Sequence, residues 1–199
     1  MLIKEFLERS IRHQLSEKQK LDYLESKQDL TARELAEGVE YLFEFMKTPP
    51  KFEGAIDICG TGGSKLPRIN TSTISAIICS SNGIKIAKHG NNAASGRFGS
   101  FDLLEKIGYR EAFNSNLLFL HARKYHPIMK EFVAIRKKIA KPTFFNLMGP
   151  LMNPLKVKKQ IIGTGYADKM HIIAQAAKIL GKEHVAVIRG EDGLDELTV

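Results

Sequence analysis

Residues 55–63 read Ala-Ile-Asp-Ile-Cys-Gly-Thr-Gly-Gly, and this stretch decides the fold. The mostly apolar run from Ala55 to Cys59 predicts a short buried strand, and the glycines after it predict a tight turn. Glycine has no Cβ, so the main-chain N–H groups of such a turn can face an anion. A helix opens soon afterwards at Asn70-Thr-Ser-Thr73, and its free N–H groups offer a second place for phosphate. The stretch therefore predicts a strand, a phosphate-binding loop and a helix in that order.

The glycine loop, taken alone, is also compatible with a plain tight turn. It lacks the Lys-Ser or Lys-Thr pair of a nucleotide-binding P-loop and the Gly-x-Gly-x-x-Gly spacing of a dinucleotide site. Ser72 and Thr73 are likewise ordinary residues for the start of a helix. The role of the loop therefore depends on which other sites accompany it.

Strands and helices alternate through the rest of the chain. Further strands are expected at residues 84–87, 117–120, 160–165 and 184–189, and helices at about 73–81, 100–107 and 168–180. Residues 126–151 are helical, with an interruption near Pro142 and an end at Gly149-Pro150. The alternation of strands with helices is typical of a parallel sheet joined by crossover helices. We therefore predict an α/β fold whose main part is a mostly parallel sheet.

The first 50 residues have helical periodicity instead. Apolar residues are spaced for a helix at residues 2–12 and for a weaker one after Ser16. Thr31-Ala-Arg-Glu34 is a capping box, in which the Glu34 N–H donates to the Thr31 hydroxyl. The helix that it opens ends before Pro49-Pro50. A small helical domain therefore accompanies the sheet.

Composition limits the class of protein. The 199 residues are 43% hydrophobic and 26% charged, as in an ordinary globular protein with a sizeable core. No apolar run is long enough to cross a membrane. Residues 1–14 mix acidic with basic side chains, unlike a signal or transit peptide, so we expect a cytoplasmic location. Cys59 and Cys79 each lie in an apolar stretch, which favours buried thiols over a disulfide or a metal site.

The net charge of +8 is unevenly distributed along the chain. Residues 1–50 contain eight Lys and Arg against ten Asp and Glu, whereas basic residues gather between Arg123 and Lys159. Such a bias suits a polyanionic partner, either a small phosphorylated substrate or a nucleic acid. On composition alone a solvated basic face is the simpler interpretation, so the choice rests on the sites.

A second group of polar residues follows the next predicted strand. Lys88-His-Gly-Asn91 puts a cation, a glycine and an amide at the carboxyl end of a parallel strand, where α/β sheets bind ligands. Ser95-Gly-Arg-Phe-Gly-Ser100 then leads into a helix, so Ser100 either caps that helix or binds phosphate. Taken singly, His89 and Ser100 are more easily explained as structural residues. Together with the glycine loop, the set indicates a binding site.

An acidic loop follows the last predicted strand. Gly190-Glu-Asp-Gly-Leu-Asp-Glu196 has four carboxylates within six residues, which repel one another unless a cation or water relieves them. Hard oxygen ligands suit Mg²⁺, which commonly joins one or two protein carboxylates to the phosphates of a substrate. A solvated acidic loop is the alternative interpretation.

These motifs occur in one order along nearly the whole chain. They are Gly60-Thr-Gly-Gly63, Asn70-Thr-Ser-Thr73, Lys88-His-Gly-Asn91, Gly99-Ser100, His126-Pro127, Arg136, Phe145-Asn-Leu-Met-Gly-Pro-Leu-Met-Asn-Pro154 and Asp192-Gly-Leu-Asp-Glu196. The ordered set resembles the anthranilate phosphoribosyltransferases. No single motif identifies this family, but the set in this order is highly specific.

The resemblance implies an enzyme of tryptophan biosynthesis. Such an enzyme transfers the phosphoribosyl group of phosphoribosyl diphosphate to the amine of anthranilate. The resemblance implies that the substrates contact Gly60, Thr61, Gly62, Gly63, Asn70, Ser72, Thr73, Lys88, His89, Gly90, Asn91, Ser100 and Arg136. It also implies that Ser72, Asp195 and Glu196 hold Mg²⁺ on the diphosphate of the donor.

The expected catalytic residues are Lys88, His126 and Arg136. Lys88 and the magnesium ion would neutralise charge on the departing diphosphate. Asn91, His126 and Arg136 would lie along the anthranilate path, with Arg136 facing the carboxylate. His126 would orient the ring or accept a proton.

The resemblance further implies two domains and a dimer. Residues 1–50 with about 122–153 would form the helical domain, and residues 51–121 with 154–199 the sheet domain. The active site would lie in a cleft between them that closes by a hinge motion, and homodimers would form through the helical domain. Because members of the family continue well past Val199, we expect the sheet to be incomplete.

Three positions depart from the family pattern. Ser64 stands where the family usually has Asp, the loop Lys65-Leu-Pro-Arg68 is atypical, and Asn92 stands where Arg is often found. The first two border the phosphate loop, and the third follows Lys88-His-Gly-Asn91.

Two other functions remain open. A pyrimidine nucleoside phosphorylase shares the fold and a glycine-and-lysine phosphate site, but the run Asn146-Leu-Met-Gly-Pro-Leu151 and the pair Asp195-Glu196 belong to the transferase pattern. The non-enzymatic alternative is a transferase-like protein that binds nucleic acid through its basic surface, with a marked dependence on salt. The intact phosphate and magnesium motifs argue against it, so nucleic acid is not the expected partner.

Overall fold

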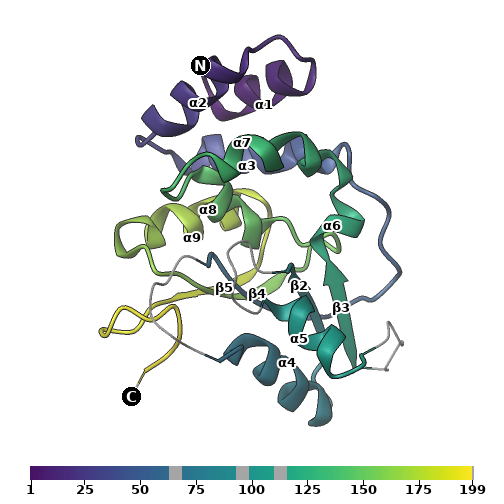
Figure 1. The fold of residues 1–199 in the computed structure, drawn as a ribbon. Helices are drawn as coiled ribbons and strands as arrows, with labels where there is room; N and C mark the ends of the chain where they lie inside the picture. Colours follow the sequence, from purple (N-terminus) through teal and green to yellow (C-terminus); the bar gives the residue numbers. More distant parts are fainter. Residues whose placement is uncertain (63–68, 93–98, 110–115, 199) are drawn as a thin grey trace.

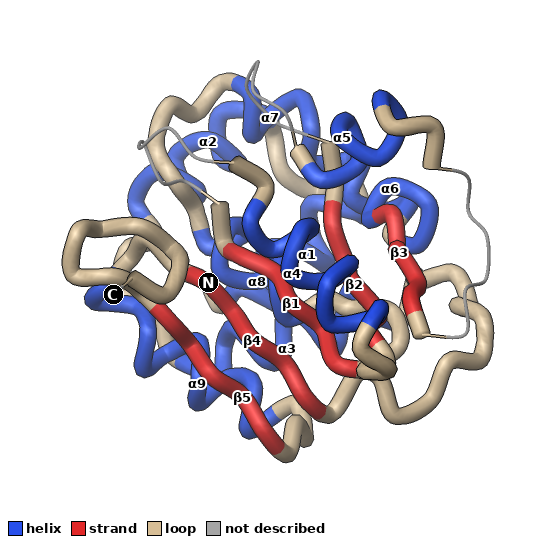
Figure 2. Tube along the Cα trace, turned by 90° about the horizontal axis from the view of Figure 1, so that it is seen from below, coloured by secondary structure: helices blue, strands red, loops and turns tan. Residues whose placement is uncertain are grey.

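Five parallel strands form one open sheet, in the order β3-β2-β1-β4-β5 (Figure 2). The structure is a computed structural model, which describes residues 1–62, 69–92, 99–109 and 116–198. The strands are β1 (Ile56–Gly60), β2 (Ile86–Gly90), β3 (Leu117–His121), β4 (Lys159–Gly163) and β5 (His184–Ile188). The central strands have apolar side chains facing both sides of the sheet, as is usual where helices cover both faces of a parallel sheet. The predicted α/β fold with a parallel sheet is thereby confirmed.

Helices lie on both faces of this sheet (Figure 1). The α-helices are α1 (Ile3–Ile11), α2 (Glu17–Ser26), α3 (Ala32–Phe43), α4 (Thr71–Ser81), α5 (Ser100–Lys106), α6 (Ala122–Tyr125), α7 (Val133–Lys137), α8 (Phe144–Leu151) and α9 (Met170–Ile179). Two short 3₁₀ helices, η1 (Pro127–Phe132) and η2 (Ala167–Lys169), precede α7 and α9. The helices α4 and α5 pack on one face of the sheet, whereas α3, α8 and α9 lie on the other.

One apolar cluster joins the N-terminal helices to the sheet. It contains Phe6 of α1, Leu35 of α3, Phe144 of α8 and Ile173 of α9, and each of these side chains is almost fully buried. The rings of Phe6 and Phe144 meet edge to face with centroids 5.9 Å apart, a favourable geometry for aromatic pairs. The helical residues 1–50 therefore pack against the segment around α8, which the sequence predicted to be helical.

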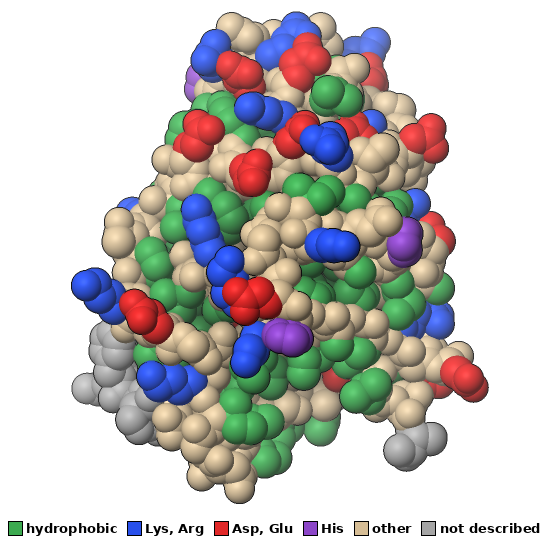
Figure 3. All heavy atoms as spheres, turned by 180° about the vertical axis from the view of Figure 1, so that it is seen from behind, with side chains coloured by type: hydrophobic (Ala, Val, Ile, Leu, Met, Phe, Trp, Pro, Cys, Tyr) green, Lys and Arg blue, Asp and Glu red, His purple; other side chains and the backbone are tan. Residues whose placement is uncertain are grey.

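The helix starts agree with the capping signals in the sequence. The Glu34 N–H donates to the Thr31 hydroxyl (3.1 Å), and the Thr31 N–H donates to the Glu34 carboxylate (3.2 Å), so the predicted capping box is confirmed. Ser16 and Gln19 form a second capping box at the start of α2, which the sequence analysis did not identify. Most acidic side chains on the face shown in Figure 3 gather over the N-terminal helices, in line with the uneven charge.

Some boundaries differ from those predicted. The helix expected to end at Gly149-Pro150 continues to Leu151, because a proline near the last turn removes only one N–H donor and its carbonyl still accepts hydrogen bonds. The strand expected at residues 84–87 begins at Ile86 and includes Gly90, since parallel pairing with β3 extends to Gly90. Cys59 is buried and Cys79 half-buried, each as a free thiol. In the described ranges, none of the helices is both long and apolar enough to cross a membrane.

Candidate active site

The predicted site residues lie mainly at the carboxyl edge of the sheet. Gly60 is the last residue of β1, Gly90 is the last residue of β2, and the acidic loop follows β5. Because all five strands are parallel, their carboxyl ends lie at one edge of the sheet, where open α/β sheets bind ligands. The glycine loop after β1, the residues after β2 and the acidic loop after β5 thus lie at the same edge of the sheet.

The acidic loop crosses directly over the ends of β1 and β4. A Cβ added at Gly163 would lie 2.0 Å from the main-chain oxygen of Asp195, and one added at Gly60 would lie 3.2 Å from its carboxylate. Only glycine leaves room for the loop at Gly163. Asp195 is 4% exposed, so the alternative of a solvated acidic loop is wrong for this residue. Gly163 was not predicted as a site residue, because no residue near it in the sequence signals the approach of a loop some thirty residues further on.

Lys88 is a buried cation that links two strands to the start of α4. It is 2% exposed, and its ammonium donates to the Ile58 carbonyl (2.7 Å) and to the Ser72 hydroxyl (3.0 Å). Burial lowers the pKa of Lys88, while the negative charges of Asp57 and Glu196 oppose that shift. Lys88 is the third residue of β2, not a residue that follows the strand as predicted, because the strand extends to Gly90. A buried ammonium next to a hydroxyl in the first turn of a helix is suited to holding an anionic group of a ligand.

The start of α4 has no side-chain cap. Asn70 occupies the N-cap position, but its amide group donates to the Gly99 carbonyl (3.4 Å) rather than capping the helix. The Ser72 hydroxyl accepts from Lys88, and the buried Thr73 hydroxyl has no hydrogen-bond partner in the described part of the chain. The interpretation of Ser72 and Thr73 as plain capping residues is therefore wrong, and this end of the helix remains suited to an anion.

The residues that follow Gly60 complete this edge. Gly62 has a positive φ of 65°, which favours glycine. Thr61 is buried, its N–H donates to the Gly163 carbonyl (2.9 Å), and its hydroxyl lies 3.2 Å from the Thr164 hydroxyl. The loop thus begins as an ordered continuation of the β1–β4 pairing. Gly63, Ser64, Lys65–Arg68 and Ser95–Phe98 lie outside the described residues.

The end of β2 meets the start of α5. A Cβ on Gly90 would lie 3.3 Å from the Cβ of Ser100, the first residue of α5. The Asn91 carbonyl accepts from the Phe101 N–H (3.4 Å), and the Asn91 side chain accepts from the N–H of Asn92 (2.9 Å). Asn92, the departure from the family pattern, donates to Asp102 over 2.6 Å. Gly90, Asn91 and Ser100 are therefore close together, as the sequence predicted.

Two buried histidines face each other below this edge. The ring centroids of His89 and His126 are 5.4 Å apart. His126 Nε2 lies 2.7 Å from the Met152 carbonyl, which only accepts, so Nε2 carries the proton and Nδ1 a lone pair. His89 is held in the same way by the main chain of Gly149, and its Nε2 has no hydrogen-bond partner in the described ranges, as is also true of His126 Nδ1. His89 Nε2 and His126 Nδ1 can therefore each accept a hydrogen bond.

Both imidazoles are neutral at physiological pH. Burial lowers the pKa of His89 to about 3, with a further contribution from the nearby His126. Burial also lowers the pKa of His126. A ring with so low a proton affinity accepts a hydrogen bond more readily than it retains a proton.

Arg136 lies in the helical layer rather than at the sheet edge. It is in α7, and its guanidinium lies 5.0 Å from the ring centroid of Phe145 in α8. A guanidinium over an aromatic ring is held by the cation–π interaction while its N–H groups can still donate to a carboxylate. Within the described ranges no hydrogen bond or ion pair joins Arg136 to Lys88 or Asp195. The structure therefore brings it together with Phe145 but not directly with the anion-binding group.

A polar network that sequence analysis missed supports the site from below. Asp57 is fully buried, and its carboxylate accepts from the His89 N–H (3.1 Å) and from Gln160 Nε2 (2.9 Å). Gln160 also donates to the Pro150 carbonyl (2.6 Å), and Asn153 donates to the Ala87 carbonyl (2.9 Å). Burial raises the pKa of Asp57. The available signal was a carboxylate in the middle of an otherwise apolar strand.

The oxygen groups at this edge fit magnesium that arrives with a phosphorylated ligand. Among the residues that the structure describes, no cluster of three His, Cys, Asp or Glu side chains has the geometry of a metal site. Ser72, Asp195 and Glu196 supply the hard oxygen atoms that Mg²⁺ prefers, and Mg²⁺ commonly takes further ligands from substrate phosphates. The adjacent buried Lys88 suits those same phosphates.

Comparison with known proteins gives consistent matches. The model of the glycosyl transferase family, a/b domain, matches residues 53–199. The anthranilate phosphoribosyltransferase of Bacillus pumilus (strain SAFR-032) is 41% identical over 179 residues, covering 85% of this chain and 53% of that protein. The chain thus spans about half the length of curated relatives such as this one.

Solved structures agree with this result. The crystal structure of anthranilate phosphoribosyltransferase (TrpD) from Thermus thermophilus matches with a TM-score of 0.86 and 30% identity, covering 98% of this chain and 63% of that one. The Saccharomyces cerevisiae enzyme in complex with PRPP and Mg matches with a TM-score of 0.81 and 27% identity, covering 98% of this chain and 61% of that one. The likeness extends over the helical layer as well as the sheet.

Proposed function

Because the chain belongs to the anthranilate phosphoribosyltransferases of the glycosyl transferase family, we propose that it transfers the phosphoribosyl group of phosphoribosyl diphosphate to the amine of anthranilate. Diphosphate is the other product, and the reaction is a step of tryptophan biosynthesis. One observation carries the proposal: a buried ammonium, a hydroxyl at a helix start and a carboxylate meet at the same sheet edge.

The donor binds at the carboxyl edge of the sheet. Lys88 and Ser72 hold its charged oxygens, and the start of α4 contributes N–H groups. Gly60, Thr61, Gly62, Gly63, Asn70, Thr73, His89, Gly90, Asn91 and Ser100 complete the contacts with the substrates. At Gly60 and Gly90 an added Cβ would lie only 3.2 Å from the Asp195 carboxylate and 3.3 Å from the Ser100 Cβ, so glycine leaves the most room there.

Magnesium is held by Asp195, Glu196 and Ser72 together with the donor diphosphate. The S. cerevisiae relative was solved with both PRPP and Mg, which supports this pairing. When bound there, the ion would neutralise negative charge on the departing diphosphate. Lys88 adds a second positive charge at the same place, which favours departure of diphosphate.

The acceptor anthranilate approaches from the side of the helical layer. Its amine lone pair forms the bond to C1 as the bond from C1 to the diphosphate oxygen breaks, and the electron pair leaves on that oxygen. The nitrogen then loses one proton, which the departing diphosphate takes up. The lone pairs of His89 Nε2 and His126 Nδ1 accept hydrogen bonds from the amine N–H groups and orient it for attack. With a pKa of about 3, His89 orients the amine better than it holds the released proton.

Arg136 binds the carboxylate of anthranilate. Its guanidinium is already oriented by Phe145, so the loss of side-chain entropy on binding is small. Arg136 lies across from the sheet edge, on the helical layer, and the acceptor bridges the two. Lys88, His126 and Arg136 are therefore the proposed catalytic residues.

The domain division, the dimer and the location belong to the same proposal. Residues 1–50 with about 122–153 form the helical domain, residues 51–121 with 154–199 form the sheet domain, and a hinge motion closes the cleft between them. Two copies associate through the helical domain in the cytoplasm. The packing of Phe6 against Phe144 supports the grouping of α1 with α8.

A pyrimidine nucleoside phosphorylase is the less favoured alternative, since the relatives that match carry the transferase name. Nucleic-acid binding is likewise less favoured, because Lys88, the basic residue of the site at the sheet edge, is buried rather than exposed on the surface.

The test is the fluorescence of anthranilate in the presence of the chain, phosphoribosyl diphosphate and magnesium. We expect the fluorescence to fall only when all three are present. Consumption of thymidine with phosphate under the same conditions, with anthranilate untouched, would replace the proposal by the phosphorylase.

A further inference from the structure

The sheet opens between β1 and β2 toward its carboxyl edge. Each of the other neighbouring pairs of strands is paired at five positions, whereas β1 and β2 pair only at Ile56 with Ile86. Figure 2 shows the two strands diverging toward their carboxyl ends. These ends are Gly60 and Gly90, which both belong to the donor site proposed above.

A side chain takes one of the main-chain groups that would continue the pairing. After the pair of Ile56 with Ile86, the next bonds of a parallel ladder would join the Ile58 N–H to the Ala87 carbonyl and the His89 N–H to the Ile58 carbonyl. The His89 N–H donates instead to the Asp57 carboxylate (3.1 Å). The bond from His89 to β1 is therefore replaced by a longer bridge through a side chain.

Two further side chains take the carbonyls of the same missing bonds. The Ile58 carbonyl accepts from the Lys88 ammonium (2.7 Å), and the Ala87 carbonyl accepts from Asn153 Nδ2 (2.9 Å). Three of the main-chain groups that would join the strands thus have side-chain partners. The opening is therefore a built feature of the sheet, with its polar groups satisfied.

A ligand between the two strand ends requires such an opening. Strands joined by a full ladder lie about 4.8 Å apart, which leaves no room for a ribose that carries phosphate groups. Continued pairing would place Gly60 directly beside Gly90, just as Gly60 pairs with Gly163 on its other side. The proposed donor could then not lie between the glycine loop and the residues after β2.

The side chains that hold the opening are buried. Asp57 and Asn153 are 0% exposed, and Lys88 is 2% exposed. Burial of polar side chains costs free energy that a continuous main-chain ladder would not require. Departures of this kind from ordinary sheet packing are typical of functional sites.

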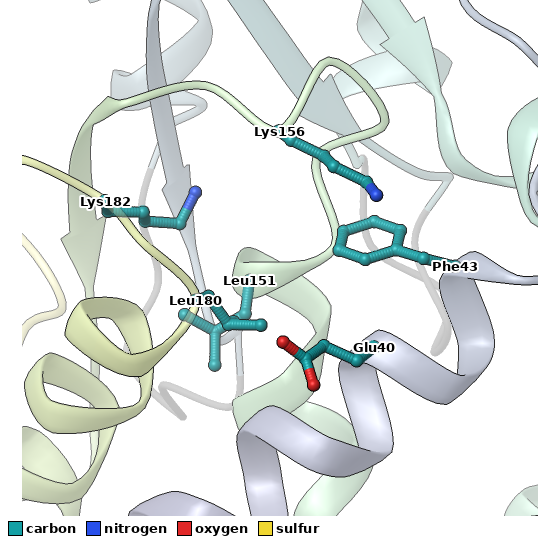
Figure 4. Close-up of a pocket in the computed structure, with 6 residues that line it drawn as sticks. All are labelled: Glu40, Phe43, Leu151, Lys156, Leu180 and Lys182. Carbon is teal, nitrogen blue, oxygen red and sulfur yellow. The ribbon is translucent and has the colours of Figure 1, made fainter.

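Cations on both sides of the sheet act on Asp57. Lys88 lies on the side of α4, where it contacts Ser72. Lys182 lies on the side of α3 and α8, in a small hollow (Figure 4) whose lining residues are Glu40, Phe43, Leu151, Lys156, Leu180 and Lys182. Burial raises the pKa of Asp57, and both lysines oppose that shift. The two cations therefore favour the carboxylate form, which accepts hydrogen bonds.

We propose that Asp57 is a positioning residue of the donor site, which keeps the carboxyl ends of β1 and β2 apart so that phosphoribosyl diphosphate fits between them. Asp57 does this by withdrawing the His89 N–H from the ladder, without touching the donor. Asn153, in the turn after α8, supports the opening at the Ala87 carbonyl. The inference rests on the proposed function, because it names the donor as the ligand of the opening.

The experiment compares Asp57→Val with Asp57→Asn in the 199-residue chain. Valine accepts no hydrogen bond, so the His89 N–H is free to donate to the Ile58 carbonyl, which has a second lone pair beside its bond from Lys88. Asparagine keeps a side-chain oxygen for the His89 N–H. Both variants lose the charge of Asp57 and its bond from Gln160, so a difference between them comes from the acceptor for His89.

Two quantities are measured on each variant. Calorimetric titration gives the affinity for phosphoribosyl diphosphate with Mg²⁺. Scalar coupling across hydrogen bonds, in the ¹⁵N,¹³C-labelled chain, shows whether the His89 N–H is bonded to the Ile58 carbonyl. We expect Asp57→Val to gain this coupling and to bind the donor at least about tenfold more weakly, because binding must then break main-chain hydrogen bonds. Asp57→Asn should resemble the parent chain in both quantities.

Two more variants complete the design. Ser80→Ala is the control, since it removes a buried hydroxyl that donates to the Ile77 carbonyl within α4, and it should change neither quantity. If Asp57→Val does not fold, Asn153→Ala takes its place. That change frees the Ala87 carbonyl for the Ile58 N–H, so coupling between these two groups should appear together with weaker donor binding.

Three results would overturn the proposal. They are parent-like donor affinity in Asp57→Val, or in Asn153→Ala where that variant takes its place; weaker donor binding without the new coupling; and an equal loss of affinity in Asp57→Asn and Asp57→Val. Failure of the proposed function has a different signature, because the parent chain itself would then not bind the donor, and this inference would fall with it.

Discussion

The ammonium of Lys88 donates to the hydroxyl of Ser72 over 3.0 Å, which joins β2 to the first turn of α4. Lys88 is almost fully buried, and the negative charge of Glu196 in the acidic loop acts on it. Three segments that are far apart in the sequence therefore meet at one charged group.

Replacing Lys88 tests whether its ammonium binds phosphoribosyl diphosphate. We expect Lys88→Met to weaken binding of phosphoribosyl diphosphate at least about tenfold, because a charge-assisted hydrogen bond contributes roughly 1.5–3 kcal/mol. Lys85→Met is the control, since Lys85 lies just before β2 and its ammonium packs 5.8 Å from the ring centroid of Phe52 instead. Calorimetric titration measures both affinities. Equal affinities for the two variants would remove Lys88 from the donor site.

A methyl group at Gly163 should displace the acidic loop. The added Cβ would lie 2.0 Å from the Asp195 carbonyl oxygen, so the loop must move although the sheet can remain intact. We expect Gly163→Ala to reduce the magnesium dependence of donor binding. Gly149→Ala is the matched control, because a Cβ there meets nothing within 4 Å and the φ angle is not positive. Unchanged magnesium dependence in Gly163→Ala would show that the position of Asp195 is not important for the metal.

Acid should destabilise the fold through the buried histidines. His89 has a pKa of about 3 when folded against roughly 6.5 when unfolded, so between these values the unfolded chain binds a proton that the folded chain does not. The contribution of His89 to the free energy of unfolding is therefore fully present above about pH 6.5. As the pH is lowered below that value, the free energy of unfolding decreases by about 1.4 kcal/mol per pH unit for one proton.

Urea unfolding at pH 7, 6 and 5 measures this effect. We expect His89→Gln to flatten the dependence on pH, whereas His171→Gln, which changes an exposed histidine, should leave it as in the parent chain. If the free energy of unfolding of His89→Gln depended on pH as steeply as that of the parent chain, His89 would not be a buried neutral imidazole.

Arg136 should act on the acceptor and not on the donor. We expect Arg136→Ala to raise the KM for anthranilate about tenfold or more, with little change in the KM for phosphoribosyl diphosphate. Lys137→Ala is the control, because Lys137 is the exposed neighbour of Arg136 on the same helix. Arg136→Lys keeps the charge but loses the planar guanidinium and its paired N–H donors, so it should recover only part of the affinity. Equal effects on both substrates would indicate a structural role for Arg136.

Local sequence signals predicted the parts of the fold that depend on nearby residues. The strand around Ile58, the helix after Asn70 and the capping box of Thr31 follow from apolar spacing and from side chains three residues apart. The placement of Gly60 and Gly90 at one edge of the sheet also follows, since both end strands of one parallel sheet.

The remaining features depend on contacts between distant segments. The need for glycine at position 163 arises only because the chain returns over it at Asp195. The partners of Asp57 come from β2 and β4, so the sequence of its own strand does not specify them. The same holds for His89 and His126. One ring nitrogen of each is bonded to the main chain at the end of α8, which leaves the other nitrogen as an acceptor. Local periodicity carries no information about such pairings.

The most direct test of the central claim is the coupling between donor and magnesium at the sheet edge. Calorimetry measures the affinity for phosphoribosyl diphosphate with and without Mg²⁺, on the parent chain and on the double variant Asp195→Asn, Glu196→Gln. Glu191→Gln, which changes an exposed carboxylate of the same loop, is the control. We predict that Mg²⁺ strengthens donor binding in the parent chain and in the control, and that the double variant loses this coupling. Coupling that survives undiminished in the double variant would contradict the account.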